Sequence, residues 1–194
     1  MPNQDDPRLF SPQCHSLEPV ATAHVNPWFS VKNRGGYFTV EYNAPQVLVL
    51  PIVDEKAIVM VRVYRPVIAD NTLELPAGGI NGKETPVAAA ARELREETGI
   101  SLVNLDRFQM LPPLVHMVRS PTLPYIFQVN LSQREYDLRG EHDHEIADVE
   151  SFSFKEVLKK IEQGELYVGL QIAVIMRCFI CNRIIKQTED LYTV

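Results

Sequence analysis

The sequence predicts an α/β (α+β) fold in which helices pack on a mixed β-sheet. Its 194 residues are 45% hydrophobic, enough for a core, and correspond to one domain with an extension. Strand-like runs rich in β-branched residues come first, followed by a helix, further strands and two closing helices. That order requires strands and helices to share one core, as they do in layered α/β and α+β domains.

The first 45 residues are predicted to form an N-terminal arm and strand extension, and residues 46–194 form the main domain. Residues 1–30 are rich in Pro, Asn, Asp and His and show little periodicity. Such a segment is typical of an arm that wraps the domain or a partner subunit. Strand-like alternation begins at residues 37–42 and ends at the turn signal Asn43-Ala-Pro45.

Residues 46–53 and 57–64 are predicted to pair as a β-hairpin. Both runs are rich in Val, Ile and Leu, and a short polar segment separates them. A short strand at 72–75 is expected to end at Pro76, because proline cannot donate a ladder hydrogen bond. Further strand candidates of similar composition follow at 105–111, 123–129 and 147–154.

The clearest helix of the chain starts after Thr85 and ends before Gly99. Thr85 can cap the first turn, and Pro86 occupies the first helical position, where proline is favoured. Residues 88–91 are alanines, which are strong helix formers, and a glycine such as Gly99 commonly follows the last turn. Two more helices are predicted near the end of the chain, at 155–163 and 168–185.

Composition excludes several functional classes. The chain has 19 Lys and Arg against 25 Asp and Glu, a net charge of −6, whereas proteins that bind nucleic acid need a basic surface. Its longest apolar stretch, residues 168–180, is too short and too polar to span a bilayer, and the first residues lack the apolar segment of a signal peptide. Three cysteines without a disulfide pattern predict a reducing, cytoplasmic compartment: Cys14, Cys178 and Cys181.

Three glutamates share one side of the central helix. At 100° per residue, Glu93, Glu96 and Glu97 fall within an arc of about 100°, which Arg92 borders. Like charges at this spacing repel one another, whereas Mg²⁺ prefers such oxygen ligands. By itself the stripe leaves a solvated acidic face as an alternative to a metal site. The opposite, predicted buried face consists of Val87, Ala88, Ala90, Ala91 and Leu94.

The frame around these glutamates is more specific than the stripe. Gly78, Glu84 and the segment Arg92-Glu-Leu-Arg-Glu-Glu-Thr-Gly-Ile100 match the Nudix box, Gly-x5-Glu-x7-Arg-Glu-apolar-x-Glu-Glu-x-Gly-apolar, at every fixed position. With residue frequencies of roughly one in fifteen, a chance match is on the order of one in a hundred million per starting point. The chain therefore resembles the Nudix hydrolases.

The resemblance implies an α/β/α sandwich and Mg²⁺- or Mn²⁺-dependent hydrolysis of a nucleoside diphosphate linked to another moiety. Glu93, Glu96 and Glu97 match the metal-binding glutamates of the family, and Glu96 and Glu97 also count as catalytic residues. Arg92 matches the arginine that orients them. Ala77 is a candidate to offer its backbone carbonyl to a metal.

Two strand segments indicate which branch of the Nudix hydrolases the chain resembles. Arg62-Val-Tyr-Arg-Pro66 and the Glu-Leu-Pro-Ala-Gly context that follows it resemble the ADP-ribose pyrophosphatase and nucleoside-diphosphate-sugar branch. The resemblance implies that Arg65 contacts substrate, with a surface ion pair as the alternative, and that Glu74 lies near the metals. Trp28, Tyr37 and Phe38 lie where this branch often places an aromatic ring that stacks on adenine, although packing within a strand explains them equally well.

The loop Gly140-Glu-His-Asp-His-Glu145 resembles the acidic loop that supplies a glutamate acting on the attacking water. Glu145 is the first candidate and Glu141 the second, and the chemistry requires that the carboxylate reach the water. By contrast, residues 111–124 depart from the branch, because they lack the glycine of its usual Ser/Pro-Gly loop. The substrate is therefore predicted only as a small nucleoside diphosphate conjugate: ADP-ribose, a nucleotide sugar or another adenosine diphosphate derivative.

Two alternatives stay open at this point. One is a catalytically silent nucleotide-sensing module, which the intact box disfavours. The other is a Nudix enzyme for capped RNA or for oxidised nucleoside triphosphates, which the acidic charge balance and the Tyr-Arg-Pro context disfavour. The resemblance also implies a homodimer that exchanges N-terminal strands, and no nucleic acid or membrane partner is expected.

Overall fold

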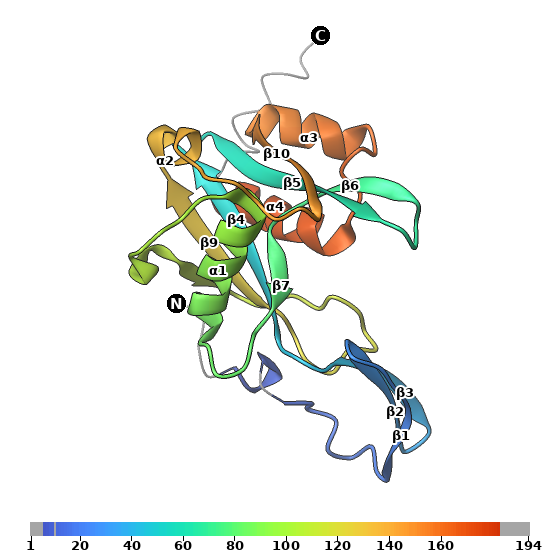
Figure 1. Cartoon of the computed structure of the whole chain (residues 1–194). Helices are drawn as coiled ribbons and strands as arrows, with labels where there is room; N and C mark the ends of the chain where they lie inside the picture. The colour runs from blue at the N-terminus through green and yellow to red at the C-terminus, as the bar shows by residue number, and fades with distance from the viewer. Residues whose placement is uncertain (1–5, 10, 183–194) are drawn as a thin grey trace.

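The molecule contains two sheets, and the small sheet lies at one end of the main sheet (Figure 1). The structure is a computed structural model that describes residues 6–9 and 11–182. The main sheet has the strand order β10-β5-β4-β9-β8, with β6 beside β5 and β7 beside β4. Only β4 and β9 pair in parallel among its described strands. The strands are β4 (Gln46–Val53), β5 (Ala57–Arg65), β6 (Asp70–Glu74), β7 (Ala77–Gly79), β8 (Gln109–Leu111), β9 (Tyr125–Leu131) and β10 (Ile146–Ser153).

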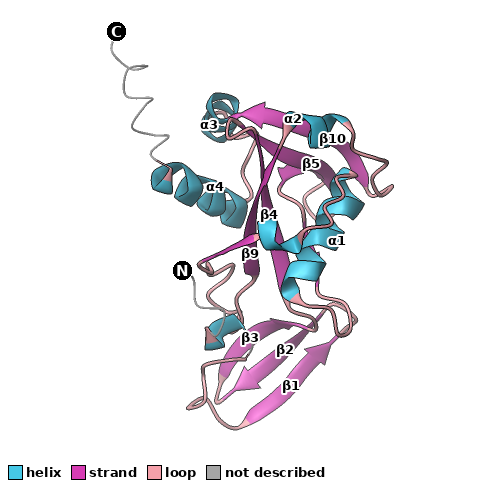
Figure 2. Cartoon of the chain, turned by 90° about the vertical axis from the view of Figure 1, so that its left-hand side faces the viewer, coloured by secondary structure: helices cyan, strands magenta, loops and turns pink. Residues whose placement is uncertain are grey.

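Helices cover both faces of the main sheet, which gives the α/β/α sandwich expected from the sequence. In Figure 2, α1 (Pro86–Thr98) and α4 (Gly169–Cys181) lie on opposite sides of β4 and β9. On β4 the valines Val47 and Val49 face the α1 side, whereas Leu48 and Leu50 pack with α4 and α3 (Phe154–Glu162). Burial of one such side chain contributes about 1.5–3 kcal/mol, so a strand buried on both faces anchors the fold.

The second sheet is antiparallel and consists of β1 (Val20–Val25), β2 (Phe29–Arg34) and β3 (Tyr37–Tyr42). The sequence predicts an unpatterned arm over residues 1–30, but the structure places β1 and the start of β2 there. All six residues of β1 are exposed. Because neither face of the strand is buried, packing does not impose an alternation of apolar and polar side chains on it. Ladder hydrogen bonds to β2 hold it instead, and those leave no trace in a hydropathy pattern.

The long loop 112–124 joins the two sheets. Its Arg119 carbonyl accepts a hydrogen bond from the Val40 N–H at 2.9 Å, and its guanidinium lies 4.0 Å from the centre of the Tyr37 ring. A charged group over an aromatic face is an attractive contact of about 0.5–1 kcal/mol at an exposed site. The loop therefore fixes the small sheet against the main domain at strand β3.

Other elements differ from the sequence-based expectation only locally. The strand expected at 105–111 is a 3-10 turn (Leu105–Arg107) followed by the short β8, because the Asn104 side chain accepts the Asp106 N–H and favours the turn. The short helix α2 (Gln133–Asp137), which a capping box of Ser132 and Glu135 starts, was not expected. The helix predicted at 168–185 is α4, and residues 183–185 lie outside the described part of the chain.

Within the described part of the chain, no helix has both the length and the apolar character needed to cross a membrane. The three cysteines, Cys14, Cys178 and Cys181, are free.

Helix α1 begins and ends where the sequence predicts. The Thr85 side chain accepts the Ala88 N–H at 3.3 Å, and Gly99 follows the last turn in the left-handed conformation, with φ of +73°. The Gly99 carbonyl accepts the N–H of Gly140 at 2.9 Å. A Cβ at Gly99 would lie 2.2 Å from the Gly140 carbonyl oxygen, so only glycine permits this contact between α1 and the loop 140–145.

Gly99→Ala is expected to destabilise the protein more than Gly164→Ala does. Both glycines have a positive φ, which costs an alanine about 1–2 kcal/mol, but a Cβ at Gly164 meets no atom within 4 Å. The steric overlap with Gly140 should add about 1–3 kcal/mol for Gly99→Ala alone. Urea unfolding of both variants measures the difference, and equal losses would show that the approach of Gly140 imposes no constraint.

Candidate active site

Arg92 lies at the centre of the acidic side of α1. Its Nη1 donates to Glu93 Oε1 and to Glu96 Oε2, both at 2.8 Å. Its Nη2 donates to Glu84 Oε1 at 2.8 Å and to the Gly79 carbonyl at 2.7 Å. These hydrogen bonds raise the pKa of Arg92 above its usual value and hold the pKa of Glu84 below its own. Arg92 therefore fixes the carboxylates and joins α1 to the loop that precedes it.

Glu93 is buried against strand β7. A Cβ at Gly78 would lie only 2.1 Å from Glu93 Oε1, so the carboxylate occupies the space that any other residue at this position would fill. Burial raises the pKa of Glu93, and the hydrogen bond from Arg92 opposes that rise. The backbone of β7 thus forms one wall of a cradle for this carboxylate.

Glu97 lies one turn further along α1. Its Oε2 accepts the Ala77 N–H at 3.0 Å, and no cationic side chain in residues 6–9 or 11–182 pairs with it. Burial raises the pKa of Glu97 to about 8, and the nearby charges of Glu93 and Glu74 add to the rise. A partly buried carboxylate without an ion-pair partner is unfavourable when ionised, and a bound cation would relieve this cost.

The sequence places all three glutamates on one side of α1, and the structure distinguishes them. Glu93 and Glu97 turn toward β7, whereas Glu96 is partly exposed and bonds Arg92 and, through Oε1, Arg95 at 2.8 Å. Ala89, on the same side, is fully buried, so this face is not a solvated acidic surface. The apolar face of α1 packs on the sheet through Ala90 and Leu94, as expected.

The donor set fits a hard divalent cation, although the described side chains are not arranged around one. No group of three or more His, Cys, Asp or Glu side chains is close enough to hold a metal within residues 6–9 and 11–182, since Arg92 pairs with Glu93 and Glu96. Carboxylate oxygens are the ligands that Mg²⁺ and Mn²⁺ prefer, and Glu97 already lacks a counter-charge. Glu93, Glu96 and Glu97 are therefore the candidate ligands, and the Ala77 carbonyl stays a prediction.

Arg65 and Glu74 form a second charged unit beside this helix. Arg65 Nε and Nη2 donate to the two carboxylate oxygens of Glu74 at 2.7 and 2.9 Å. Burial opposes ionisation of Glu74, but hydrogen bonds from Arg65, Thr72 and Gln171 outweigh it and hold its pKa below the usual value. Half of the Arg65 side chain remains exposed, so its outer edge is free to meet a ligand.

Arg65 and Glu74 line a pocket of about 460 Å³, together with Ala77 and Gly78. This volume lies within the range of small-molecule sites, roughly 300–1,000 Å³. Helix α4 contributes its first turn to the wall, and the N-cap residue Val168 supplies no side-chain hydrogen bond to that turn. The remaining wall belongs to β3, the start of β4 and the loop 112–124: Tyr42, Ala44, Pro45, Gln46, Val47, Leu48, His116, Ser120, Thr122, Leu123 and Pro124.

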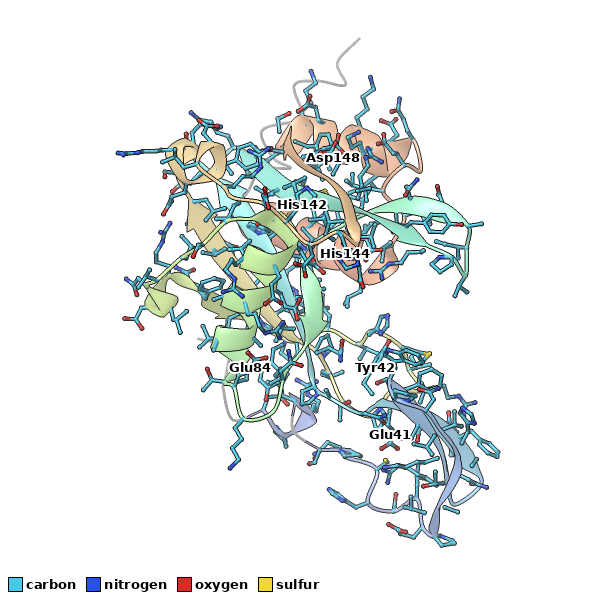
Figure 3. The ribbon with its side chains drawn as sticks, viewed as in Figure 1. Glu41, Tyr42, Glu84, His142, His144 and Asp148 are labelled. Carbon is cyan, nitrogen blue, oxygen red and sulfur yellow. The ribbon has the colours of Figure 1, made fainter. Side chains whose placement is uncertain are left out.

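The loop 140–145 is held at the end of α1. Its Gly140 N–H bonds the Gly99 carbonyl, and the Asp143 N–H donates to the Glu96 carbonyl at 2.8 Å. Figure 3 shows His142 and His144 near one end of α1 and Glu84 near the other. Glu145 is exposed, and its charge contributes to the raised pKa of Arg65. The loop thus carries its carboxylates toward the same side of the sheet as Arg65.

The three aromatic residues expected to stack on adenine, Trp28, Tyr37 and Phe38, lie outside this pocket in a single chain. Trp28 is 73% exposed and Tyr37 is covered on one face by Arg119. The aromatic rings that line the pocket are instead Tyr42 and His116, which the sequence analysis did not propose. The positions of Tyr42 and His116 depend on the contact between β3 and the loop 112–124. The turn after Tyr42 is the one local feature of the sequence that could have indicated these two residues.

Comparisons with known proteins agree with the geometry. A model of the NUDIX domain family matches residues 43–169. An ADP-ribose pyrophosphatase of Bacillus subtilis (strain 168) is 31% identical over 124 residues, which cover 62% of this chain and 64% of that protein. An ADP-sugar pyrophosphatase of Mus musculus is 41% identical over 61 residues, covering 29% of this chain and 28% of that protein. Each match spans less than two thirds of the relative's own length.

Among solved structures, a crystal structure described as an ADP compounds hydrolase superposes with a TM-score of 0.62. The superposition covers 96% of this chain and 98% of that chain, at 18% sequence identity. At this level of identity the similarity establishes that the two chains share a fold.

Gly78→Ala is expected to weaken the binding of Mn²⁺ by about 10- to 100-fold, the usual effect of disturbing groups that orient metal ligands. The new Cβ would overlap the Glu93 carboxylate and displace it. Gly79→Ala is the matched control, because a Cβ there would meet its nearest atom at an ordinary 3.6 Å. Isothermal titration calorimetry with MnCl₂ measures both variants, and equal affinities would contradict the role of the Gly78 cradle.

Proposed function

Since this chain belongs to the NUDIX domain family, we propose that it is a divalent-metal-dependent pyrophosphohydrolase that cleaves a nucleoside diphosphate linked to another moiety. The products are a nucleoside monophosphate and a phosphorylated second part. ADP-ribose is the first substrate candidate and a nucleotide sugar the second, because the relatives include an ADP-ribose pyrophosphatase and an ADP-sugar pyrophosphatase.

One observation carries the proposal: the glutamates of α1 adjoin a pocket that also contains an arginine. Ala77 and Gly78 line the pocket on one side and contact Glu97 and Glu93 on the other. Arg65 faces the same pocket. A pyrophosphate needs positive charge near both phosphates, and Arg65 and a cation held by the carboxylates are together suited to supply it.

The glutamates of α1 bind the divalent metal. Glu93, Glu96 and Glu97 hold Mg²⁺ or Mn²⁺, with the Ala77 carbonyl as a further candidate ligand. A bound cation of this kind neutralises the pyrophosphate, orients it and makes a water more nucleophilic. Arg92 is a positioning residue, because it fixes Glu93 and Glu96 through direct hydrogen bonds.

Arg65 and Glu145 act at the substrate side. Arg65 binds a phosphate of the substrate with its exposed edge, and Glu74 holds the guanidinium in place from behind. Glu145 accepts a proton from the attacking water as general base, with Glu141 as the second candidate, and the anchoring of the loop to α1 supports this role. Glu96 and Glu97 contribute to the same step through the metal site.

We also propose that the protein is a homodimer and is located in the cytoplasm. Trp28, in the turn between β1 and β2, and Tyr37, on β3, are exposed, so they can stack on an adenine only if a second copy of the chain brings them to its pocket. A homodimer formed through residues 1–45 would do so and would cover exposed apolar side chains of the small sheet, such as Val25 and Phe38. Free cysteines accord with a cytoplasmic location.

Glu97→Gln is expected to reduce the Mg²⁺-dependent release of AMP from ADP-ribose by about a thousandfold, or ~4 kcal/mol of transition-state stabilisation. The substitution removes the carboxylate charge but keeps its size. EDTA should abolish the activity of the wild-type protein, and added Mg²⁺ should restore it.

The matched control for this experiment is Glu162→Gln at the end of α3, which lies on the surface away from the pocket. Its activity should equal that of the wild type. If Glu97→Gln retained full activity, or the wild type worked in EDTA, the proposed function would be wrong.

A homodimer predicts a mass of twice the chain in light scattering. Trp28→Glu, which places a charge in the exposed turn between β1 and β2, should shift the protein to the monomer. Val103→Glu is the matched control, because Val103 is also exposed but belongs to the main domain. A wild-type protein that is monomeric at micromolar concentration would refute the dimer.

A further inference from the structure

The pocket beside α1 has two chemically different ends. Arg65 and Glu74 make one end charged, and Ala77 and Gly78 connect it to the glutamates of α1. The other end is formed by β3 and the loop 112–124. Among the residues that the structure describes, no Asp, Glu, Lys or Arg side chain lines this end of the pocket. The second end therefore suits an uncharged part of a ligand.

Two aromatic rings meet at this uncharged end. The centroids of Tyr42 and His116 are 6.2 Å apart, and the ring planes are inclined by 24°, so the rings are close to parallel. Tyr42 is 38% exposed and His116 is also exposed, and both residues line the pocket. Polar groups of Ser120 and Thr122 lie along the same wall. Flat rings with nearby hydroxyls are suited to a planar heterocycle.

Hydrogen bonds hold β3, which carries Tyr42, against the loop that carries His116. The Val40 N–H donates to the Arg119 carbonyl at 2.9 Å, and the Arg119 guanidinium donates to the Phe38 carbonyl at 3.3 Å. The Ser120 N–H bonds the Met117 carbonyl at 2.8 Å and tightens the loop after His116. In Figure 3, Tyr42 lies where the small sheet approaches this loop. The ring pair is therefore built into the fold rather than formed by two independent surface residues.

We propose that Tyr42 and His116 form a stacking platform for the nucleobase of the substrate, at the end of the pocket opposite Arg65. The identity of the ligand as a nucleotide rests on the proposed function. Tyr42 belongs to β3, whereas His116, Ser120 and Thr122 belong to residues 111–124, whose sequence departs from the ADP-ribose pyrophosphatase branch. The platform therefore gives the unusual sequence of residues 111–124 a role in substrate recognition.

Equilibrium binding of two ligands tests the platform without relying on turnover. AMP carries the base, and ribose 5-phosphate lacks it. Tyr42→Ala and His116→Ala should each weaken AMP binding roughly ten- to hundredfold, the usual effect of losing one base-stacking ring, and leave the weaker binding of ribose 5-phosphate unchanged. Tyr42→Phe keeps the ring and should bind AMP nearly as well as the wild type.

Tyr64→Ala is the matched control, because Tyr64 is an exposed aromatic residue of β5 that does not line the pocket. It should bind both ligands as the wild type does. For ADP-ribose hydrolysis, the platform variants should raise KM and leave kcat within about twofold, since stacking acts equally on the bound substrate and the transition state.

Several outcomes would overturn the platform: unchanged AMP affinity in Tyr42→Ala and His116→Ala, equal losses for AMP and ribose 5-phosphate, no AMP binding by the wild type, or a loss confined to Trp28→Ala or Tyr37→Ala. These results are separable from failure of the proposed function. A wild type that binds AMP through Tyr42 but hydrolyses no nucleoside diphosphate conjugate would refute the function and keep the platform.

Discussion

The site depends on how the negative charges of the α1 glutamates are compensated. Two unit charges 4 Å apart repel by about 4 kcal/mol in a partly buried setting, so neighbouring glutamates need a cation or must be protonated. Arg92 satisfies Glu84, Glu93 and Glu96 by hydrogen bonding to all three. Glu97 has only the Ala77 N–H as a hydrogen-bond donor within the described residues, and burial raises its pKa to about 8. The protein thus leaves one partly buried carboxylate without an ion-pair partner among those residues, ready for a cation.

Close backbone approaches make this arrangement possible. Gly78 lets β7 lie against the Glu93 carboxylate, and Gly99 lets the loop that starts at Gly140 lie against the end of α1. A side chain at either glycine would separate the helix from its neighbour. The two contacts hold α1 near its middle and at its C-terminal end, so the glutamates and the loop carboxylates keep a fixed relation to Arg65.

The pocket is a joint product of the two sheets. The main sheet supplies the charged end through β5, β6 and β7, and the small sheet supplies the aromatic end through Tyr42 of β3. The loop 112–124 connects them by bonding to β3 through Arg119. A chain without its N-terminal sheet would therefore retain the glutamates of α1 and lose part of the wall that faces a substrate.

The sequence by itself determined the features that are encoded locally. A threonine cap, a proline at the first position and a closing glycine specify α1, and β-branched runs around a polar turn specify the β4–β5 hairpin. The spacing of the box placed Glu93, Glu96 and Glu97 on one side of the helix. Only the tertiary structure decided which of these carboxylates is buried and which one Arg92 leaves unpaired. It also decided that β1 forms although its side chains are all exposed, and that Tyr42 meets His116. Those features depend on hydrogen bonds and contacts between segments far apart in the chain, and such contacts leave no periodic pattern in the residues that make them.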